Sequence, residues 1–119
     1  MRFTEEEKEK VLENIRLIKQ WIDDNCNVLR ETIKIPIPHQ TYNLKFYVSD
    51  VVTFLVIGSR TVYLKEVNNN FVERDVLISE YNIEHAFTII KHWPIIKQKL
   101  LDIINKQEED LNTLMNFSI

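Results

Sequence analysis

The stretch YNLKFYVSDVVTFLVIGSRTVYLKEVNNNFVERDVLIS, residues 42–79, decides the fold that the sequence predicts. Apolar and polar side chains alternate along residues 42–48, which is typical of a strand with one buried face. An apolar run follows at residues 51–57, and residues 60–67 and 71–78 add two more segments of strand length. We therefore predict four antiparallel strands in chain order.

Three turn signals set the predicted pairing of these strands. Gly58, the only glycine in the chain, precedes Ser59 and suits the first position of a type II′ hairpin turn. Residues 68–70 are asparagines, which tolerate positive φ and bond their own backbone. A turn at residues 49–50 has the least chemical support, because neither residue favours a type I′ turn. The resulting cross-strand pairs are Leu44 with Leu55, Phe46 with Thr53, Ile57 with Arg60, Leu55 with Val62, Thr53 with Leu64, Val62 with Val76 and Leu64 with Arg74.

One face of the predicted sheet is apolar, and we expect helices to cover it. Successive side chains of a strand point to opposite faces, so these registers collect the large apolar residues on one side. Its members are Tyr42, Leu44, Phe46, Val48, Val51, Leu55, Ile57, Val62, Leu64, Val72, Val76 and Ile78.

The opposite face mixes aromatic and charged side chains in two predicted cross-strand rows. The rows are Lys45, Phe54, Tyr63 and Asp75, and Tyr47, Val52, Lys65 and Glu73. Aromatic residues with charged neighbours are typical of the core and rim of protein interfaces. We therefore predict a partner-binding surface formed by Lys45, Tyr47, Phe54, Tyr63 and Lys65. The alternative is that the chain's own N-terminal helix, or a second copy of the chain, covers this face.

Residues 32–38 carry three alternating isoleucines and two prolines. Because proline has no backbone N–H to donate, this segment can pair only at the edge of a sheet. The sheet then has four strands, or five if the segment pairs.

A long helix is predicted before the sheet. Thr4 and Glu7 have the spacing of a capping box at its start. Apolar residues then recur every three or four positions, as in a helix with one buried side: Val11, Ile15, Ile18 and Ile22. The pattern weakens at residues 24–27, where we expect the helix to end, and residues 28–31 can add a further turn.

Two helices are predicted after the sheet. Ser79 or Asn82 can cap the first of them, whose apolar side spans residues 83–90. Pro94 disfavours the α conformation in Trp93 and is well placed in the first turn of a new helix. We therefore expect the two helices to meet at an angle.

The last predicted helix carries an apolar seam at heptad-like spacing, interrupted by Gln107 and by acidic residues 108–110. The seam consists of Ile96, Leu100, Ile103, Ile104, Leu111 and Leu114. A narrow seam of this kind usually packs on the chain's own sheet. The alternative is a homodimer through Ile96, Leu100, Ile103, Leu111 and Leu114, because the pattern runs past the length that the sheet needs.

Length and composition indicate one globular domain, residues 1–119. The apolar content of 45% and charged content of 28% are ordinary for a globular chain. The net charge is −3 with both signs interspersed, which argues against direct binding of nucleic acid. The N-terminus is charged and no apolar run has membrane-spanning length, so we expect no signal peptide, no membrane contact and a cytoplasmic location.

No residue pattern indicates a catalytic, metal or cofactor site. A single glycine leaves none for a glycine-rich phosphate-binding loop. Cys26 has no base at motif spacing, and we expect an inert thiol. His85 and His92 are too few ligands for a zinc site, so we expect them at a helix surface or boundary.

The predicted fold class is α+β: an N-terminal helix, a four-stranded or five-stranded antiparallel meander, and two C-terminal helices packed on one face of the sheet. The leading functional hypothesis is a non-enzymatic module that binds a host or cognate protein, because every catalytic pattern is missing and the mixed sheet face resembles an interface. The chain is rich in Ile, Asn and Lys, residues of AT-rich codons typical of low-GC bacteria and their phages. An inhibitor of a host protein fits this composition: an anti-CRISPR or other anti-defence protein, or a toxin immunity protein. The alternatives are a structural homodimer and a small-molecule-binding domain.

Overall fold

The computed structural model describes residues 2–44, 47–58, 62–68, 73–77 and 83–119. For residues 37–44, 47–54, 62–68 and 73–77 the description covers the backbone only. The elements in chain order are α1 (Glu5–Asn25), β1 (Ile33–Leu44), β2 (Tyr47–Ile57), β3 (Val62–Asn68), β4 (Glu73–Leu77) and α2 (Ile83–Met115).

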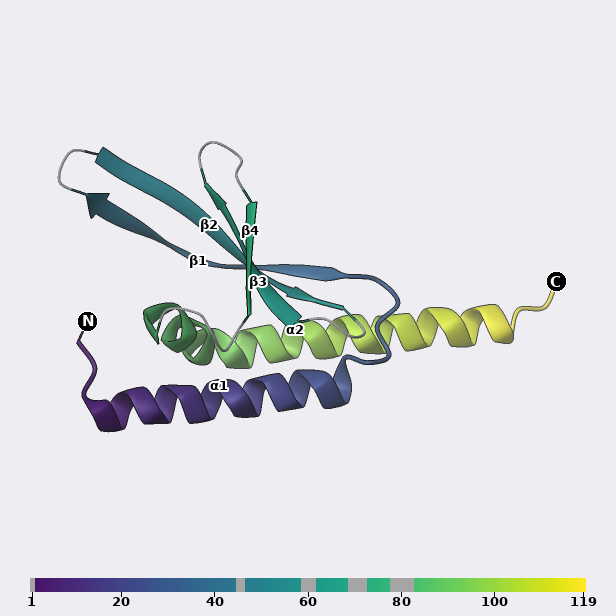
Figure 1. The fold of residues 1–119 in the computed structure, drawn as a ribbon. Coiled ribbons are helices and arrows are strands. Elements are labelled where there is room, and N and C mark those ends of the chain that lie inside the picture. Colours follow the sequence, from purple (N-terminus) through teal and green to yellow (C-terminus); the bar gives the residue numbers. More distant parts are fainter. Residues whose placement is uncertain (1, 45–46, 59–61, 69–72, 78–82) are drawn as a thin grey trace.

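The two helices flank an antiparallel hairpin in the sequence; in space they pack against each other, and in the view of Figure 1 α2 lies between α1 and the strands. The strands are hydrogen-bonded in the order β1-β2-β3-β4, and each neighbouring pair is antiparallel. The predicted order, helix before and helix after antiparallel strands, is confirmed at the level of two helices with an antiparallel hairpin between them.

Helix α1 begins at the predicted capping box. The backbone N–H of Thr4 donates to Glu7 Oε1 at 2.8 Å, and the N–H of Glu7 donates to Thr4 Oγ1 at 3.2 Å. These two bonds satisfy donors that a helix start leaves without an intrahelical partner. The four predicted core residues of α1 are all buried: Val11, Ile15, Ile18 and Ile22. The helix ends at Asn25, with Cys26 as its C-cap, within the expected range.

The first hairpin is longer than predicted. Residues 49–50 lie inside β2, where Asp50 pairs with Thr41, so the predicted turn at this place is wrong. Residues 32–38 do not form a separate fifth strand, because residues from Ile33 onward belong to β1 at the edge of the sheet. The edge position suits the two prolines, which cannot donate to a second neighbour.

Strand β1 contains residues of two segments that the sequence predicts separately, 32–38 and 42–48, and a register shift between Ile37 and Gln40 separates them. Before the shift Ile35 pairs with Leu55, and after it Tyr42 pairs with Ser49. An extra residue at a bulge changes which alternate positions share a face. The pairing alternation along β1 therefore changes phase between Ile37 and Gln40.

The other two registers each differ from the prediction by two residues. Leu55 pairs with Leu64 rather than with Val62, and Leu64 pairs with Val76 rather than with Arg74. A shift of two residues preserves the predicted parity of the pairing, because strand positions alternate with a period of two. Residues 58–61 therefore separate β2 from β3, and the predicted two-residue turn at Gly58 is wrong.

Helix α2 is one continuous helix that contains Pro94, so the prediction of two separate helices is wrong. Figure 1 shows that its axis changes direction: the first turns are seen nearly end-on, and the remainder runs across the view. Proline removes the hydrogen bond to the carbonyl four residues earlier and bends a helix at that point. Ile89 before the bend and Ile96 after it are both buried, and this packing holds the helix together through the bend.

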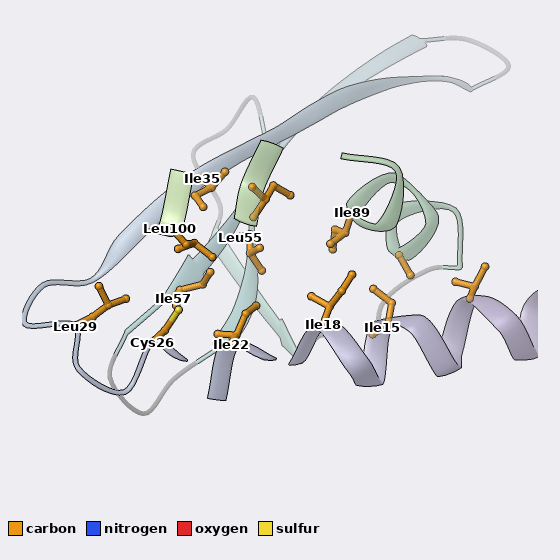
Figure 2. Close-up of a cluster of buried hydrophobic side chains, with 13 residues drawn as sticks. Ile15, Ile18, Ile22, Cys26, Leu29, Ile35, Leu55, Ile57, Ile89 and Leu100 are labelled. Atoms are coloured by element: carbon orange, nitrogen blue, oxygen red, sulfur yellow. The ribbon is translucent and has the colours of Figure 1, made fainter. Parts of the chain in front are cut away.

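The core lies between the two helices and the base of the β1–β2 hairpin (Figure 2). Leu55 and Ile57, which the sequence assigns to the apolar face, belong to this core with residues of both helices. Its buried members are Val11, Ile15, Ile18, Ile22, Cys26, Leu29, Ile35, Leu55, Ile57, Ala86, Ile89, Ile96 and Leu100. Neither of the two described helices combines the length and the apolar content that crossing a lipid bilayer requires.

Candidate functional site at the C-terminal end of helix α2

Helix α2 extends beyond the core. Leu100 is fully buried, Ile103 and Ile104 are half-buried, and Leu114 is 69% exposed. Figure 1 shows the end of α2 continuing past the end of α1. The last turns of α2 therefore present their apolar side to solvent.

We call the apolar residues of this end the C-terminal ridge: Leu111, Leu114, Met115, Phe117 and Ile119. The first three are spaced by three and four positions, so they lie on one side of the helix. Leu111 is half-buried, whereas Met115 is 81% exposed and Phe117 is 75% exposed. Large apolar side chains gathered in this way on a surface are typical of interaction sites.

Gln107 fixes the base of the ridge to the loop that follows α1. Its side-chain Nε2 donates to the carbonyl oxygen of Val28 at 2.7 Å, and its Oε1 accepts from the backbone N–H of Arg30 at 3.0 Å. Between these two residues Leu29 is buried in the core. In the sequence Gln107 stands out only as a polar residue that interrupts the apolar seam. A polar residue at a position where the spacing expects an apolar one is the signal that could have indicated a polar contact there.

A groove lies on each side of Gln107. One has a volume of about 320 Å³ and includes Leu29, Ile33 and Ile103 in its wall. The other has a volume of about 360 Å³ and includes Val28 and Ile104. Arg30, Gln107 and Leu111 line both grooves. The ridge is therefore continuous with two shallow apolar depressions at its base.

The last turns of α2 carry negative charge, whereas Arg30 and Lys106 contribute positive charge to the grooves at their base. From Gln107 to Ile119 the sequence contains Glu108, Glu109 and Asp110 and no Lys, Arg or His. Glu108 lines one groove and Asp110 lines the other. Lys106 Nζ lies 3.5 Å from Asp110 Oδ1, but both side chains are largely exposed, so the pair is screened by solvent.

A second groove system lies where α1 meets the bent part of α2. Trp21 and Trp93 make an edge-to-face contact with their ring centroids 5.3 Å apart, and Lys97 Nζ lies 5.4 Å from the Trp21 ring centroid. A depression of about 440 Å³ includes both tryptophans and Leu17 in its wall. These contacts join the two helices at the bend.

The predicted partner-binding residues of the sheet lie outside the part of the chain with described side chains. Lys45 is not among the described residues, and for Tyr47, Phe54, Tyr63 and Lys65 only the backbone is described. The register contradicts the predicted rows, because Phe54 pairs with Lys65. This surface stays a prediction.

Val56 lies on the same face of the sheet as the predicted partner-binding residue Tyr63, and its side chain is described. It pairs with Tyr63 and lies between Leu55 and Ile57, so it points away from the helices. Its side chain is nevertheless fully buried. The face opposite the helices is therefore covered at this one position.

The predicted homodimer seam is divided by the fold. Ile96 and Leu100 belong to the chain's own core, and Ile103 packs partly against that core. Only Leu111 and Leu114 of the five residues remain for a contact outside the core. The predicted five-residue dimer seam is thus reduced to two residues, because packing against the core continues along α2 past Leu100 to Ile103. Heptad spacing alone does not define where the core ends.

Cys26 is buried at the end of α1. Burial, and secondarily the negative charge of Asp23, raises the pKa of its thiol from 9.0 to about 11, so it is protonated at neutral pH. His85 and His92 lie half-buried on α2. No cluster of three metal-binding side chains occurs among the residues that the structure describes. No protein-family model matches the chain, and neither a curated protein nor a solved structure matches it significantly.

Proposed function

We propose that this chain is a non-enzymatic protein-binding module and that the C-terminal ridge is its docking surface. The observation that carries the proposal is the exposure of Leu114, Met115 and Phe117 at the end of a helix whose earlier part contributes Ile96 and Leu100 to the core. Removing such side chains from water on binding is favourable in proportion to the apolar area covered.

The attachment of the ridge supports the same proposal. The helix is continuous from the core residue Leu100 to Met115, and Gln107 joins it to the loop after α1. A surface that is held in its binding geometry before association loses less conformational entropy when the partner docks. The ridge is therefore suited to binding as a preformed helix face.

The kind of module that we propose is an inhibitor of a host protein, of the anti-defence or toxin-immunity type. Its support is the combination of small size, mild acidity and a composition typical of AT-rich genomes. The sheet surface around Phe54 and Tyr63 is a second candidate docking surface, supported by the mixed composition of that face.

A homodimer is the second candidate function, and the half-buried Leu111 and the exposed Leu114 are the residues that favour it. Two copies paired over these residues bring their acidic segments, residues 108–110, within a few residues of each other. Like charges within roughly one Debye length, about 8–10 Å, repel at physiological salt. The acidic segment thus favours a different protein as the partner.

Affinity capture with three baits tests the proposal: the wild type, Leu114→Asp and Phe54→Lys. The lysate comes from a low-GC bacterium, and thermal unfolding of each bait verifies that the fold is retained. A protein retained by the wild type and Phe54→Lys but lost with Leu114→Asp supports the ridge. The reverse pattern transfers the function to the sheet face. Retention of nothing by any bait, with a monomer in solution, contradicts a protein-binding function.

A further inference from the structure

The charges of the C-terminal ridge are arranged on its two flanks. Glu108 precedes Leu111 by three positions and lines the groove on one side of Gln107. Asp110 precedes Leu114 by four positions and lines the groove on the other side. In a helix, residues at these spacings are neighbours on the surface. Each flank of the apolar ridge therefore carries one carboxylate at its base.

Glu109 has the same charge but a different position. It lines neither groove, and the helical period of 3.6 residues places it on the side of α2 away from Leu111. The neighbours that follow it at helical spacing are Asn112 and Thr113, which are polar. The acidic segment thus has two members beside the ridge and one behind it.

We propose that the ridge binds a basic amphipathic helix of another protein; this inference rests on the function proposed above and specifies the partner's chemistry. The partner's apolar side covers Leu111, Leu114 and Met115. Its flanking Lys or Arg side chains meet Glu108 on one side and Asp110 on the other. An amphipathic helix docked against a hydrophobic surface, with charges matched at the rim, is a recurrent mode of recognition.

The charges also discriminate against other occupants. An anionic membrane surface or a nucleic acid would approach three carboxylates with no basic residue between Gln107 and Ile119. A second copy of the chain carries the same acidic flanks. A partner with basic flanks gains electrostatic energy from Glu108, and from Asp110 where it replaces the solvent-screened pair of Asp110 with Lys106.

Two synthetic peptides of about 18 residues, long enough to form a helix, test the partner's chemistry. One is an amphipathic Leu/Lys peptide and the other replaces every Lys with Glu; both carry a fluorophore for anisotropy titration. We expect the Leu/Lys peptide to bind at least about tenfold more tightly, with an affinity that falls as salt is added. Equal binding of the two peptides overturns the inference, while the ridge remains the docking surface.

Matched variants locate the contact. Glu108→Lys is expected to weaken binding of the Leu/Lys peptide by roughly three- to tenfold, and Glu109→Lys by less than about twofold. Leu114→Asp is expected to weaken it by more than about tenfold. Ile95→Asp is its control, because Ile95 lies on the same helix and is also 69% exposed. Equal effects of Glu108→Lys and Glu109→Lys contradict the flank assignment.

Light scattering of the wild type and Leu114→Asp distinguishes failure of the basic-helix inference from failure of protein binding at the ridge. A dimer that Leu114→Asp disperses makes a second copy the occupant, which overturns the basic partner but retains protein binding at the ridge. A monomer that binds neither peptide, and captures no protein through Leu114, overturns both.

Discussion

Gln107 Nε2 on α2 donates a hydrogen bond to the carbonyl oxygen of Val28 at 2.7 Å. Val28 lies in the loop that precedes the strands in the sequence, whereas Gln107 follows them. The same side chain accepts from the N–H of Arg30, so one amide satisfies two backbone groups of a loop that has no regular structure. This contact is where the core ends and the projecting part of α2 begins.

Replacing Gln107 with Leu tests the value of that contact. The variant loses both hydrogen bonds, and we expect the free energy of unfolding to fall by about 1–2 kcal/mol, since a neutral hydrogen bond contributes about 0.5–1.5 kcal/mol. Urea denaturation gives the value. Gln98→Leu is the control, because Gln98 bonds Asp102 on its own helix, and we expect a change below about 0.5 kcal/mol. Equal effects would show that the loop contact contributes nothing.

The division of the seam into core and surface predicts opposite results for two leucines of one helix. Leu100→Ala is expected to cost about 2–5 kcal/mol, because Leu100 is fully buried and its truncation leaves a cavity. Leu114→Ala is expected to change stability by less than about 0.5 kcal/mol, since Leu114 is exposed. Urea denaturation of both variants decides. A large loss for Leu114→Ala would mean that the ridge is already covered in the free protein.

The capping box predicts a local contribution at the start of α1. Thr4→Ala removes the acceptor of the Glu7 N–H and is expected to destabilise the protein by about 1 kcal/mol. Thr113→Ala, in the last turns of α2, is the control and is expected to be neutral. The same cap lowers the pKa of Glu7, chiefly through the hydrogen bond from the Thr4 backbone. The Thr4 side chain also lowers this pKa, and Thr4→Ala removes that contribution while keeping the backbone donor. An unchanged pKa of Glu7 in Thr4→Ala, measured by NMR titration, would contradict the contribution of the side chain.

Cys26 predicts a loss of stability at alkaline pH. Burial raises the pKa of its thiol from 9.0 to about 11, so the folded state retains a proton that the unfolded state releases. The stabilising contribution is fully present below pH 9 and is lost as the pH rises toward 11, by up to about 2 kcal/mol. Urea denaturation at pH 8 and pH 10.5 measures it. Cys26→Ala should have a smaller difference between the two pH values than the wild type; an equal difference refutes the assignment to Cys26.

The parts of the fold that the sequence predicts correctly depend on local rules. The Thr4 capping box and the stripe from Val11 to Ile22 need only helical spacing, and the structure contains both. The length of the first hairpin depends on a bulge between Ile37 and Gln40, which changes the alternation within one strand. A bulge has no reliable signature in a single sequence, so Ser49 was the wrong place for a turn.

The candidate site was harder to predict because it depends on where the core stops. Leu100 and Leu114 occupy equivalent positions of one heptad pattern, yet the first is fully buried and the second is exposed. Periodicity gives the buried side of a helix but not the point at which its neighbours end. The assignment of Glu108 and Asp110 to opposite flanks of the ridge depends on the two grooves on either side of Gln107. The sequence shows only a run of three acidic residues.

The bend at Pro94 sets the direction of the ridge. Met115 lies about 30 Å along the helix from this proline, at 1.5 Å per residue, so a change of about 10° in the bend displaces Met115 by about 5 Å. The packing of Trp93 against Trp21 lies next to the bend and opposes such a change. A substitution at Trp93 can thus misdirect the ridge and disengage a docked partner while every residue of the ridge itself is unaltered.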